Sequence, residues 1–366
     1  MMKLLIISNS SSGLYGIRKE LIHELKKKYS ILILSPNDGR MEELKYMSDW
    51  VSPLKIDRRG VNCIREIRLF FDILTKVLSV CPDMVITYTI KPNIYAGIIC
   101  RINHIKHCAN ITGLGTSFYK KGILRRIIIA LYRVALKKTK VVFFENSVNK
   151  GIFIEEKIIK ASKACVLNGA GVNLEYFNYQ KYPKVDNPVS FLFIGRLMRE
   201  KGIEELFQAC RRLNNENYSI RLHILGGYEE DYRLQVDTYM KEGWLIYHGV
   251  KDNVRPYLAE THCVILPSWH EGMANTNLEA AASGRPVITS NIPGCREAVI
   301  DGISGLYCKP RNVLSIYQAM KKFIVMDNSE RECLGIAGRN HMERVFDRKK
   351  VVKESIDRMT NELNKC

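Results

Sequence analysis

Two basic side chains, Arg196 and Lys201, follow a strand-like run that ends at Gly195. A glycine lets a ligand approach the backbone closely, and an arginine can hold a diphosphate through two parallel hydrogen bonds. Lys201 precedes a helical segment, where its charge adds to the positive end of the helix dipole and favours anions. A solvated basic turn would contain the same residues, so this segment alone does not separate a diphosphate site from a surface turn.

Two carboxylates, Glu271 and Glu279, lie eight residues apart after the apolar run 263–266. Glu279 falls inside the predicted helix 277–283, where it could accept both hydroxyls of a ribose. Glu271 falls in the preceding loop, where it could meet a sugar. Backbone N–H groups between the two carboxylates lie near a helix N-terminus and suit a phosphate. These groups belong to Gly272, Met273, Ala274, Asn275 and Thr276. For a glutamate pair taken by itself, the ordinary alternative is one helix-surface charge and one loop charge.

Short apolar runs alternate with helical segments along the chain, which predicts βαβ units and parallel sheets. The strands expected in the first half are 3–8, 30–34, 84–88, 107–111 and 141–145, and 164–168 closes this half. The helices expected there are 17–28, which follows a Ser/Gly turn at 9–13, and 62–80. In the second half we expect strands at 189–194, 220–225, 245–247, 263–266 and 286–289, with helices at 201–212 and 277–283.

This restart of the strand pattern predicts an α/β fold of two domains, 1–168 and 188–347. Residues 169–187 show no clear periodicity and are interpreted as a linker. The charged amphipathic segment 348–366 is expected to be a helix that packs back on the first domain. Because open α/β sheets bind ligands at the carboxyl ends of their strands, a cleft between two doubly wound sheets is the expected active site.

The segments around these charged residues resemble a known family. The strongest likeness runs through 193–202 and 266–300, where Pro-Ser precedes a Glu-x7-Glu arrangement and Ala-x-Ala-Ser-Gly-Arg-Pro-Val-Ile follows it. The stretches 293–299 and 301–305 extend the match. The chain thereby resembles the retaining glycosyltransferases of family 4. Within that group it is similar to capsule, O-antigen and protein-glycan assembly enzymes, in particular N-acetylgalactosaminyltransferases that extend an undecaprenyl-diphosphate-linked sugar.

The resemblance implies a GT-B fold, in which two Rossmann-like domains face each other across a cleft. It implies that Arg196 and Lys201 bind the donor diphosphate and stabilise the leaving group. Glu271 would contact the transferred sugar and Glu279 the nucleotide ribose, so that Glu271, Lys201 and Arg196 form the catalytic set. A loop around Gly13 in the first domain would close over the diphosphate.

The same resemblance implies a hexosyltransferase that needs neither a metal nor a cofactor, because cationic side chains neutralise the diphosphate. The chain contains no Asp-x-Asp triplet. The expected outcome is retention by front-face transfer, in which the leaving diphosphate helps to deprotonate the acceptor. Most of the catalysis would come from holding donor and acceptor together and from stabilising the departing diphosphate. The donor is expected to be a UDP-sugar and the acceptor a polyprenyl-diphosphate-linked saccharide.

One position departs from the family pattern. Many relatives carry a histidine after a strand of the first domain, where it touches the donor sugar, but this chain reads Ile-Thr-Tyr-Thr-Ile-Lys-Pro-Asn over 86–93. Tyr88, Lys91 or Asn93 is expected to take over the contact. Thr112 and Gly113 follow another strand and are expected near the acceptor, although a plain turn fits them equally well. His104 and His107 are interpreted as surface or structural residues.

The positive charge is concentrated in the first half of the chain. Residues 1–165 contain 29 Lys and Arg against 13 Asp and Glu, whereas the rest contains 27 against 25. Such a half is attracted to anionic surfaces, for which the candidates are anionic lipid, a polyprenyl diphosphate or nucleic acid. Residues 120–140 combine basic and apolar side chains, which favours a membrane-surface helix, with a domain helix that has a basic rim as the alternative.

The remaining features of the sequence point to one compartment. Eleven scattered cysteines without a Cys-x2-Cys pair argue against disulfides and zinc and favour a reducing cytoplasm. The chain has no apolar run long enough to span a bilayer and no signal-peptide pattern. We therefore expect a cytoplasmic protein attached peripherally to the inner face of the cell membrane.

Two other classes of protein remain as alternatives. A nucleotide-sugar epimerase or hydrolase could use the same fold, although the pattern of two cations and two glutamates argues against it. A basic nucleic-acid-binding protein is suggested by the charge alone. No zinc-finger, RNP or helix-turn-helix pattern supports that class, so we expect no nucleic-acid partner.

Overall fold

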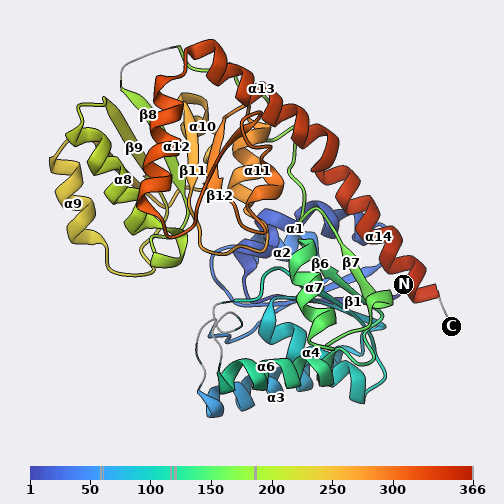
Figure 1. Cartoon of the computed structure of the whole chain (residues 1–366). Coiled ribbons are helices and arrows are strands. Elements are labelled where there is room, and N and C mark those ends of the chain that lie inside the picture. The colour runs from blue at the N-terminus through green and yellow to red at the C-terminus, as the bar shows by residue number, and fades with distance from the viewer. Residues whose placement is uncertain (58–59, 61, 116–117, 119–121, 185–187, 365–366) are drawn as a thin grey trace. The chain divides into compact units, whose positions relative to one another are not determined.

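A computed structural model describes residues 1–57, 60, 62–115, 118, 122–184 and 188–364. The chain divides into two compact units, Met1–Ala170 with Lys349–Cys366 (unit 1) and Gly171–Arg348 (unit 2). Each unit is built on one parallel sheet covered by helices on both faces (Figure 1). Burial on both faces explains why the strands are almost continuously apolar rather than alternating.

Unit 1 contains seven strands in the order β3-β2-β1-β4-β5-β6-β7. Their bounds are β1 (Lys3–Ile7), β2 (Ser30–Ser35), β3 (Trp50–Pro53), β4 (Met84–Tyr88), β5 (Lys106–Ile111), β6 (Val141–Phe144) and β7 (Ala164–Val166). The helices are α1 (Ser11–Lys26), α2 (Met41–Met47), α3 (Cys63–Val80), α4 (Ile90–Ile102), α6 (Ile123–Ala135), α7 (Ser147–Glu155) and α14 (Arg348–Asn364). One core joins the sheet to α1, α2 and α14, and two further cores join its other face to α3, α4, α6 and α7.

Unit 2 contains six strands in the order β10-β9-β8-β11-β12-β13. Their bounds are β8 (Val189–Ile194), β9 (Ile220–Leu225), β10 (Leu245–Gly249), β11 (Cys263–Leu266), β12 (Val287–Ser290) and β13 (Gly305–Cys308). The helices are α8 (Ile203–Asn215), α9 (Arg233–Lys241), α10 (Arg255–Glu260), α11 (Asn275–Ala282), α12 (Val313–Val325) and α13 (Asn328–Val345). One core contains residues of α8, α9 and α12, and another contains residues of α10, α11 and α13.

The strand orders place one reversal of direction in each sheet. The chain moves from β1 to one side of the first sheet and returns to β4 on the other side, and it does the same from β8 to β11 in the second sheet. Loops that follow the two central strands diverge at such a point, and open α/β sheets bind ligands there. The segments after β1, β4, β8 and β11 are therefore where a ligand site belongs.

The segment 169–187 is not a free linker as far as it is described. Val172, Phe177 and Tyr182 are buried, and the first two belong to a core of unit 2. The backbone of Val172 also exchanges hydrogen bonds with Phe346 and Arg348. The expectation of a linker was wrong for this part of the chain because its apolar side chains are spaced irregularly, although they pack on unit 2.

The last helix belongs to unit 1. Val351, Val352 and Met359 of α14 are buried in the same core as Leu4 and Ile6 of β1.

Among the described residues, no helix is long and apolar enough to cross a bilayer.

Candidate functional site

The reversal point of unit 2 brings two of the predicted segments together. β8 pairs directly with β11, with Phe191 opposite Cys263 and Leu192 opposite Val264. Gly195 and Arg196 follow β8, and the loop with Glu271 follows β11. Because parallel strands end at the same edge of the sheet, both loops start side by side.

Two glycines allow these loops to pack tightly. At Gly202, where φ is +72°, an added Cβ would lie 2.2 Å from the carbonyl oxygen of Pro267. At Gly294, where φ is +87°, an added Cβ would lie 2.6 Å from the carbonyl oxygen of Gly272. The N–H of Trp269 also donates to the carbonyl oxygen of Glu200 at 2.9 Å. Any larger residue at either glycine would push the loops apart.

Lys201 and Glu271 form the centre of the site. Lys201 lies in a short 3₁₀ turn, Arg199–Lys201, just before α8, and its Nζ donates to Oε1 of Glu271. Ser268 Oγ donates to the same carboxylate oxygen at 2.8 Å. The two charged side chains are 22% and 13% exposed. The predicted cation and the predicted sugar-contacting carboxylate therefore lie in direct contact, in a place that excludes much of the solvent.

Arg196 has a different partner in this structure. Its Nη1 donates to Oε2 of Glu229 at 2.7 Å, and its side chain is 48% exposed. Within the part of the chain that the structure describes, no hydrogen bond or ion pair joins Arg196 to Lys201 or to Glu271. Arg196 is attached to the same loop as Lys201, but its guanidinium does not take part in the Lys201–Glu271 contact.

Glu279 lies on α11, as predicted, and is partly buried. Burial raises the pKa of its carboxyl to about 7, and the positive charge of Arg348 counteracts part of that rise. A carboxyl with such a pKa is readily switched between its two protonation states near neutral pH. Hydrogen bonds donated by ligand hydroxyls favour its charged form.

The predicted phosphate-binding amides of 272–276 are only partly available. The N–H of Ala274 donates to the carbonyl oxygen of Gly294 at 2.7 Å, and the N–H of Asn275 donates to that of Met273 at 3.0 Å. These two amides already have acceptors within the protein, in the chain after β12 and in the turn before α11, and the binding of a phosphate by this segment stays a prediction. Met273 and Ala274 are buried, and Gly272 lies against Gly294. Thr276 lies in the first turn of α11.

Gly13 does not lie in a loop. It belongs to the first turn of α1, which begins six residues earlier than expected, and its N–H donates to Ser10 Oγ at 3.0 Å. Asp38 accepts hydrogen bonds from the N–H of Ser11 at 2.6 Å and of Ser12 at 3.1 Å, as well as from the Ser10 hydroxyl. The expectation of a loop at Gly13 was therefore wrong, and the start of α1 already binds a carboxylate of the protein, while the role of Gly13 at the diphosphate stays a prediction.

The Asp38 carboxyl is held in its charged form. Burial opposes its ionisation, but the hydrogen bonds from Ser11, Ser10 and Ser12 outweigh burial and keep its pKa below the usual value. Because Asp38 and Ser10 are 28 residues apart, no local sequence pattern predicts this helix cap.

Lys91, Asn93 and Tyr88 are all engaged within unit 1. Lys91 Nζ donates to Glu66 Oε1 at 2.6 Å and to the carbonyl oxygen of Gly60 at 2.8 Å. Asn93 is fully buried, accepts from Thr87 Oγ1 at 2.6 Å and donates to the carbonyl oxygen of Asn110 at 2.8 Å. Tyr88 is buried with the Arg18 guanidinium over its ring. All three side chains therefore already have partners within the protein, and the contact of one of them with the donor sugar stays a prediction.

Thr112 and Gly113 follow β5 and are partly exposed. Thr112 forms no side-chain hydrogen bond with the residues that the structure describes, and the place of Thr112 and Gly113 near the acceptor stays a prediction. His107 is buried between the hydroxyls of Thr87 and Thr139, and burial lowers its pKa to about 3. His104 is exposed. Both histidines are thus structural or superficial, as expected.

Thr89 is the residue that the sequence reasoning missed. It follows β4 at the reversal point of unit 1, and its φ of 74° with ψ of 168° lies in a region that β-branched residues avoid. Its hydroxyl oxygen is buried without a hydrogen-bond partner among the described residues. Such strain concentrates at functional sites. The only signal in the sequence was its place directly after a strand.

No group of three or more His, Cys, Asp and Glu side chains within the described ranges is arranged to hold a metal ion. Among the same residues, the reversal point of unit 2 contains Lys201 paired with Glu271, Arg196 paired with Glu229, and His270 at 3.6 Å from Glu200.

Comparisons with known proteins agree with this arrangement. Residues 3–146 match the family model for glycosyl transferase 4-like proteins, and residues 177–341 match that for glycosyl transferases group 1. An N,N'-diacetylbacillosaminyl-diphospho-undecaprenol α-1,3-N-acetylgalactosaminyltransferase of Campylobacter jejuni is 24% identical over 328 residues, which cover 85% of this chain and 86% of the relative. CapM, a capsular polysaccharide biosynthesis glycosyltransferase of Staphylococcus aureus, is 23% identical over 356 residues, which cover 93% and 92%.

The fold has close counterparts among solved structures. The crystal structure of Anabaena HepE in complex with UDP-glucose superposes with a TM-score of 0.81 at 16% identity, over 99% of this chain and 100% of that one. The two sheets with their reversal points are thus the two Rossmann-like domains of the GT-B fold. Taken with the two family models, which together span both units, this places the chain in the family of group 1 and 4-like glycosyltransferases.

Proposed function

We propose that this glycosyltransferase moves a hexose or N-acetylhexosamine from a UDP-sugar to a polyprenyl-diphosphate-linked saccharide in the assembly of a surface polysaccharide or glycan. The observation that carries the proposal is the contact of Lys201 with Glu271 at the reversal point of unit 2. It supplies one cation for a diphosphate and one carboxylate for sugar hydroxyls within a single contact.

The donor would exchange partners with these side chains. A diphosphate that reaches Lys201 competes with Glu271 for the ammonium group and releases the carboxylate to accept hydrogen bonds from the sugar. Arg196 lies on the same loop and can leave Glu229, a surface partner, at little cost because exposed ion pairs are weak. Glu279 would accept the ribose hydroxyls, whose hydrogen bonds favour its charged form.

The reaction would proceed with retention of the anomeric configuration. The bond between the anomeric carbon and the diphosphate oxygen breaks, and the acceptor oxygen forms its bond on the same face. The acceptor proton passes to the departing diphosphate oxygen, so no protein base and no metal is needed. Lys201 and Arg196 would stabilise the charge that develops on the leaving group.

The donor and acceptor classes rest on the relatives. The Campylobacter jejuni relative is named for an undecaprenol-linked acceptor, and HepE was crystallised with UDP-glucose. An acceptor with a polyprenyl tail lies in a membrane, so the basic half of the chain would attach the enzyme peripherally to the anionic cytoplasmic face of the cell membrane.

A two-stage assay tests the proposal. UDP-sugars and GDP-sugars are first screened for a rise in melting temperature, because a ligand that binds only the folded state stabilises it. The stabilising UDP-sugar, labelled in its sugar, is then incubated with undecaprenyl-diphosphate-linked saccharides, and Glu271→Gln serves as the inactive control. Label in the lipid extract supports transfer. An epimerised nucleotide sugar or free labelled sugar, with no labelled lipid, would show the proposal to be wrong.

A further inference from the structure

The helix α3 carries two apolar stripes on opposite sides. Leu69, Ile73 and Val77 are buried against the sheet of unit 1. Ile64, Ile67, Phe71 and Leu78 are exposed, the first three by 63%, 57% and 56%. At 3.6 residues per turn these exposed side chains fall on one side of the helix, opposite the buried stripe. An ordinary domain helix has only the inward stripe.

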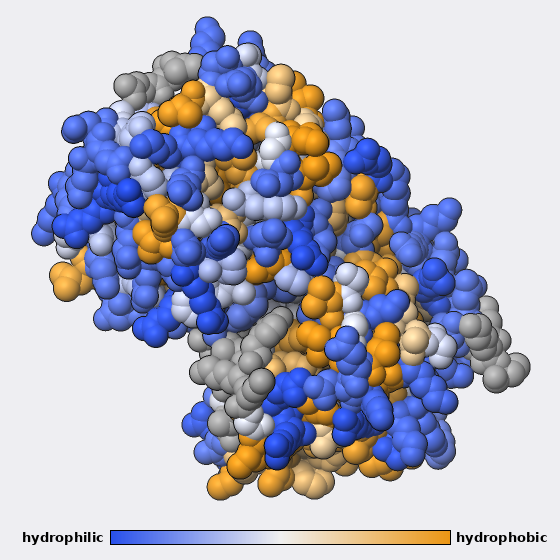
Figure 2. Space-filling view, in the orientation of Figure 1, coloured by the Kyte–Doolittle hydropathy of each residue, from blue (hydrophilic) through white to orange (hydrophobic). Residues whose placement is uncertain are grey.

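The helix α6 repeats this arrangement. Ile129, Tyr132 and Ala135 are buried, whereas Ile123, Ile127 and Val134 are exposed and fall on the opposite side. Both α3 and α6 contact α4 and cover the same face of the sheet. Exposed hydrophobic residues are interspersed with hydrophilic ones over the part of unit 1 that carries these helices (Figure 2). The basic helix predicted over 120–140 is thus partly a domain helix, and Lys120 and Lys121 lie outside the described residues.

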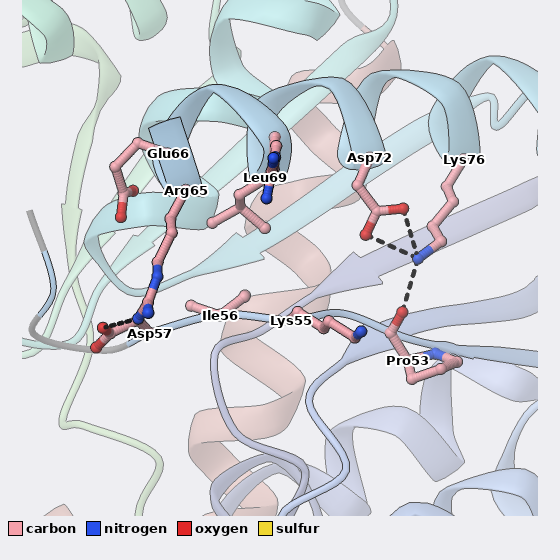
Figure 3. Close-up of a pocket in the computed structure, with 10 residues that line it drawn as sticks. Pro53, Lys55, Ile56, Asp57, Arg65, Glu66, Leu69, Asp72 and Lys76 are labelled. Carbon is pink, nitrogen blue, oxygen red and sulfur yellow. Dashed lines mark hydrogen bonds and ion pairs between the residues drawn. The ribbon is translucent and has the colours of Figure 1, made fainter. Parts of the chain in front are cut away.

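A groove of about 830 Å³ runs along α3 beside its exposed stripe. Its other wall is formed by Pro53, the last residue of β3, and by Lys55 and Ile56 of the segment that follows (Figure 3). Seven of its ten lining residues are charged. They are Lys55, Asp57, Arg65, Glu66, Arg68, Asp72 and Lys76.

The positive charges of this groove are not all neutralised. Lys76 pairs with Asp72 at 2.8 Å, Arg65 lies 3.8 Å from Asp57, and Glu66 is taken by Lys91. Among the described residues, Lys55 and Arg68 form no hydrogen bond or ion pair. Both are exposed, one on each wall. A phosphate between them would gain two charge-assisted contacts.

We propose that the outer face of α3 and α6 docks on an anionic bilayer, with the exposed stripes in the acyl boundary and a lipid head-group phosphate between Lys55 and Arg68. This inference names the surface for the membrane attachment contained in the proposed function and rests on it. An aqueous protein partner is disfavoured by the charge, because the exposed stripe of α6 is flanked by Arg126 and Arg133 and the stripe of α3 by the groove. Apolar side chains bordered by arginine and lysine match the layered chemistry of a lipid surface.

Vesicle sedimentation of the full-length protein tests the docking surface. Vesicles of phosphatidylcholine are compared with vesicles in which part of it is replaced by phosphatidylglycerol. The double variant Ile67→Ser, Phe71→Ser is expected to lower the partition coefficient on the anionic vesicles by about tenfold or more. The matched control Leu234→Ser, Met240→Ser removes two exposed side chains from α9 of unit 2 and is expected to bind like the wild type.

The groove is tested by Lys55→Gln, Arg68→Gln. This variant is expected to lose the preference for phosphatidylglycerol by about fivefold per removed charge. If it binds vesicles normally but loses only the binding of inorganic phosphate, followed by phosphorus NMR, the groove takes a free anion and the proposal is wrong. The proposal is equally wrong if Ile67→Ser, Phe71→Ser sediments with vesicles like the wild type, or changes only the oligomeric state in analytical ultracentrifugation.

Failure of this inference can be told apart from failure of the proposed function. Glu271→Gln is expected to lose transfer while it keeps vesicle binding. Ile67→Ser, Phe71→Ser is expected to keep transfer to a short-chain, water-soluble acceptor while it loses vesicle binding. If the wild type binds anionic vesicles but transfers no sugar, the docking surface is supported and the proposed transfer reaction is wrong.

Discussion

Lys201 and Glu271, which are 70 residues apart in the sequence, form an ion pair across two loops of unit 2. Ser268 shares the carboxylate oxygen and thereby fixes its direction. Under the proposed function, the pair joins the cation that would bind the diphosphate to the carboxylate that would bind the sugar. Entry of a donor would therefore separate the two side chains, so that Lys201 could bind the diphosphate and Glu271 could bind the sugar.

Replacement of Lys201 tests this coupling. Lys201→Ala is expected to lower kcat by about a hundredfold, because one charge that stabilises the leaving diphosphate is lost from a partly buried site. The Michaelis constant for the donor is expected to change much less. Steady-state kinetics with the labelled donor measure both quantities. Lys241→Ala, at an exposed end of α9, is the control, and a Lys201→Ala enzyme with wild-type turnover would remove Lys201 from the catalytic set.

Glu279 is expected to make donor binding depend on pH. Its folded-state pKa of about 7 lies above its ordinary value, so the carboxyl becomes protonated as the pH falls through about 7. A protonated carboxyl accepts ribose hydroxyls poorly, and affinity for the UDP-sugar should therefore weaken in that direction. Calorimetric titration on both sides of neutrality measures the change. Glu279→Ala should bind more weakly than the wild type, and Glu279→Gln should bind with little dependence on pH.

The raised pKa of Glu279 also predicts that the stability of the folded protein depends on pH. A carboxyl with a raised pKa contributes most below its unfolded-state pKa of 4.5, and this contribution is lost as the pH rises through about 7. Glu279→Gln should therefore raise the melting temperature relative to the wild type above neutral pH and lose that advantage in acid. Thermal unfolding at several pH values provides the comparison. An advantage that is constant across the range would contradict the assigned pKa.

Asp38 is expected to stabilise unit 1 as the cap of α1. Asp38→Ala should lower the free energy of unfolding by about 1–2 kcal/mol, since several N–H and O–H donors at the helix start lose their acceptor. Its pKa is depressed, so this contribution is present above the unfolded value and is lost as the pH falls. Urea titration measures the difference. Glu42→Ala, an exposed acid in the first turn of α2, is the control and should change stability little.

Substitutions of Thr89 can distinguish a role in stability from a role in activity. Thr89→Gly should relieve backbone strain of about 1–3 kcal/mol, partly offset by the greater freedom of glycine in the unfolded chain. If the buried hydroxyl serves the reaction, the glycine variant will be the less active enzyme. Thr89→Ser keeps the hydroxyl and should keep most of the activity. Melting temperature and kcat/KM, measured on all three enzymes, decide the matter. A glycine variant with unchanged kcat/KM would limit Thr89 to a structural role.

Several features could be predicted from neighbouring residues alone. Apolar runs such as 189–194 and 263–266 became β8 and β11, because burial on both faces of a parallel sheet demands continuous apolar stretches. The placement of Lys201, Glu271 and Glu279 after those strands followed from local order as well. Gly202 and Gly294 were not singled out, because the need for a positive φ arises from loops that meet only in the folded unit.

The sequence by itself determined the two parallel sheets, the order of their helices and strands, and the pair of cations and carboxylates that follows the central strands of unit 2. Tertiary structure alone decided that Asp38 caps α1, that Lys91 binds Glu66, and that Asn93 is buried beside Thr87. The physical reason is that periodic hydrophobicity is encoded by adjacent residues. A polar side chain, in contrast, takes whichever partner distant segments bring within hydrogen-bonding reach, and an acceptor inside the protein competes with a ligand for the same donor.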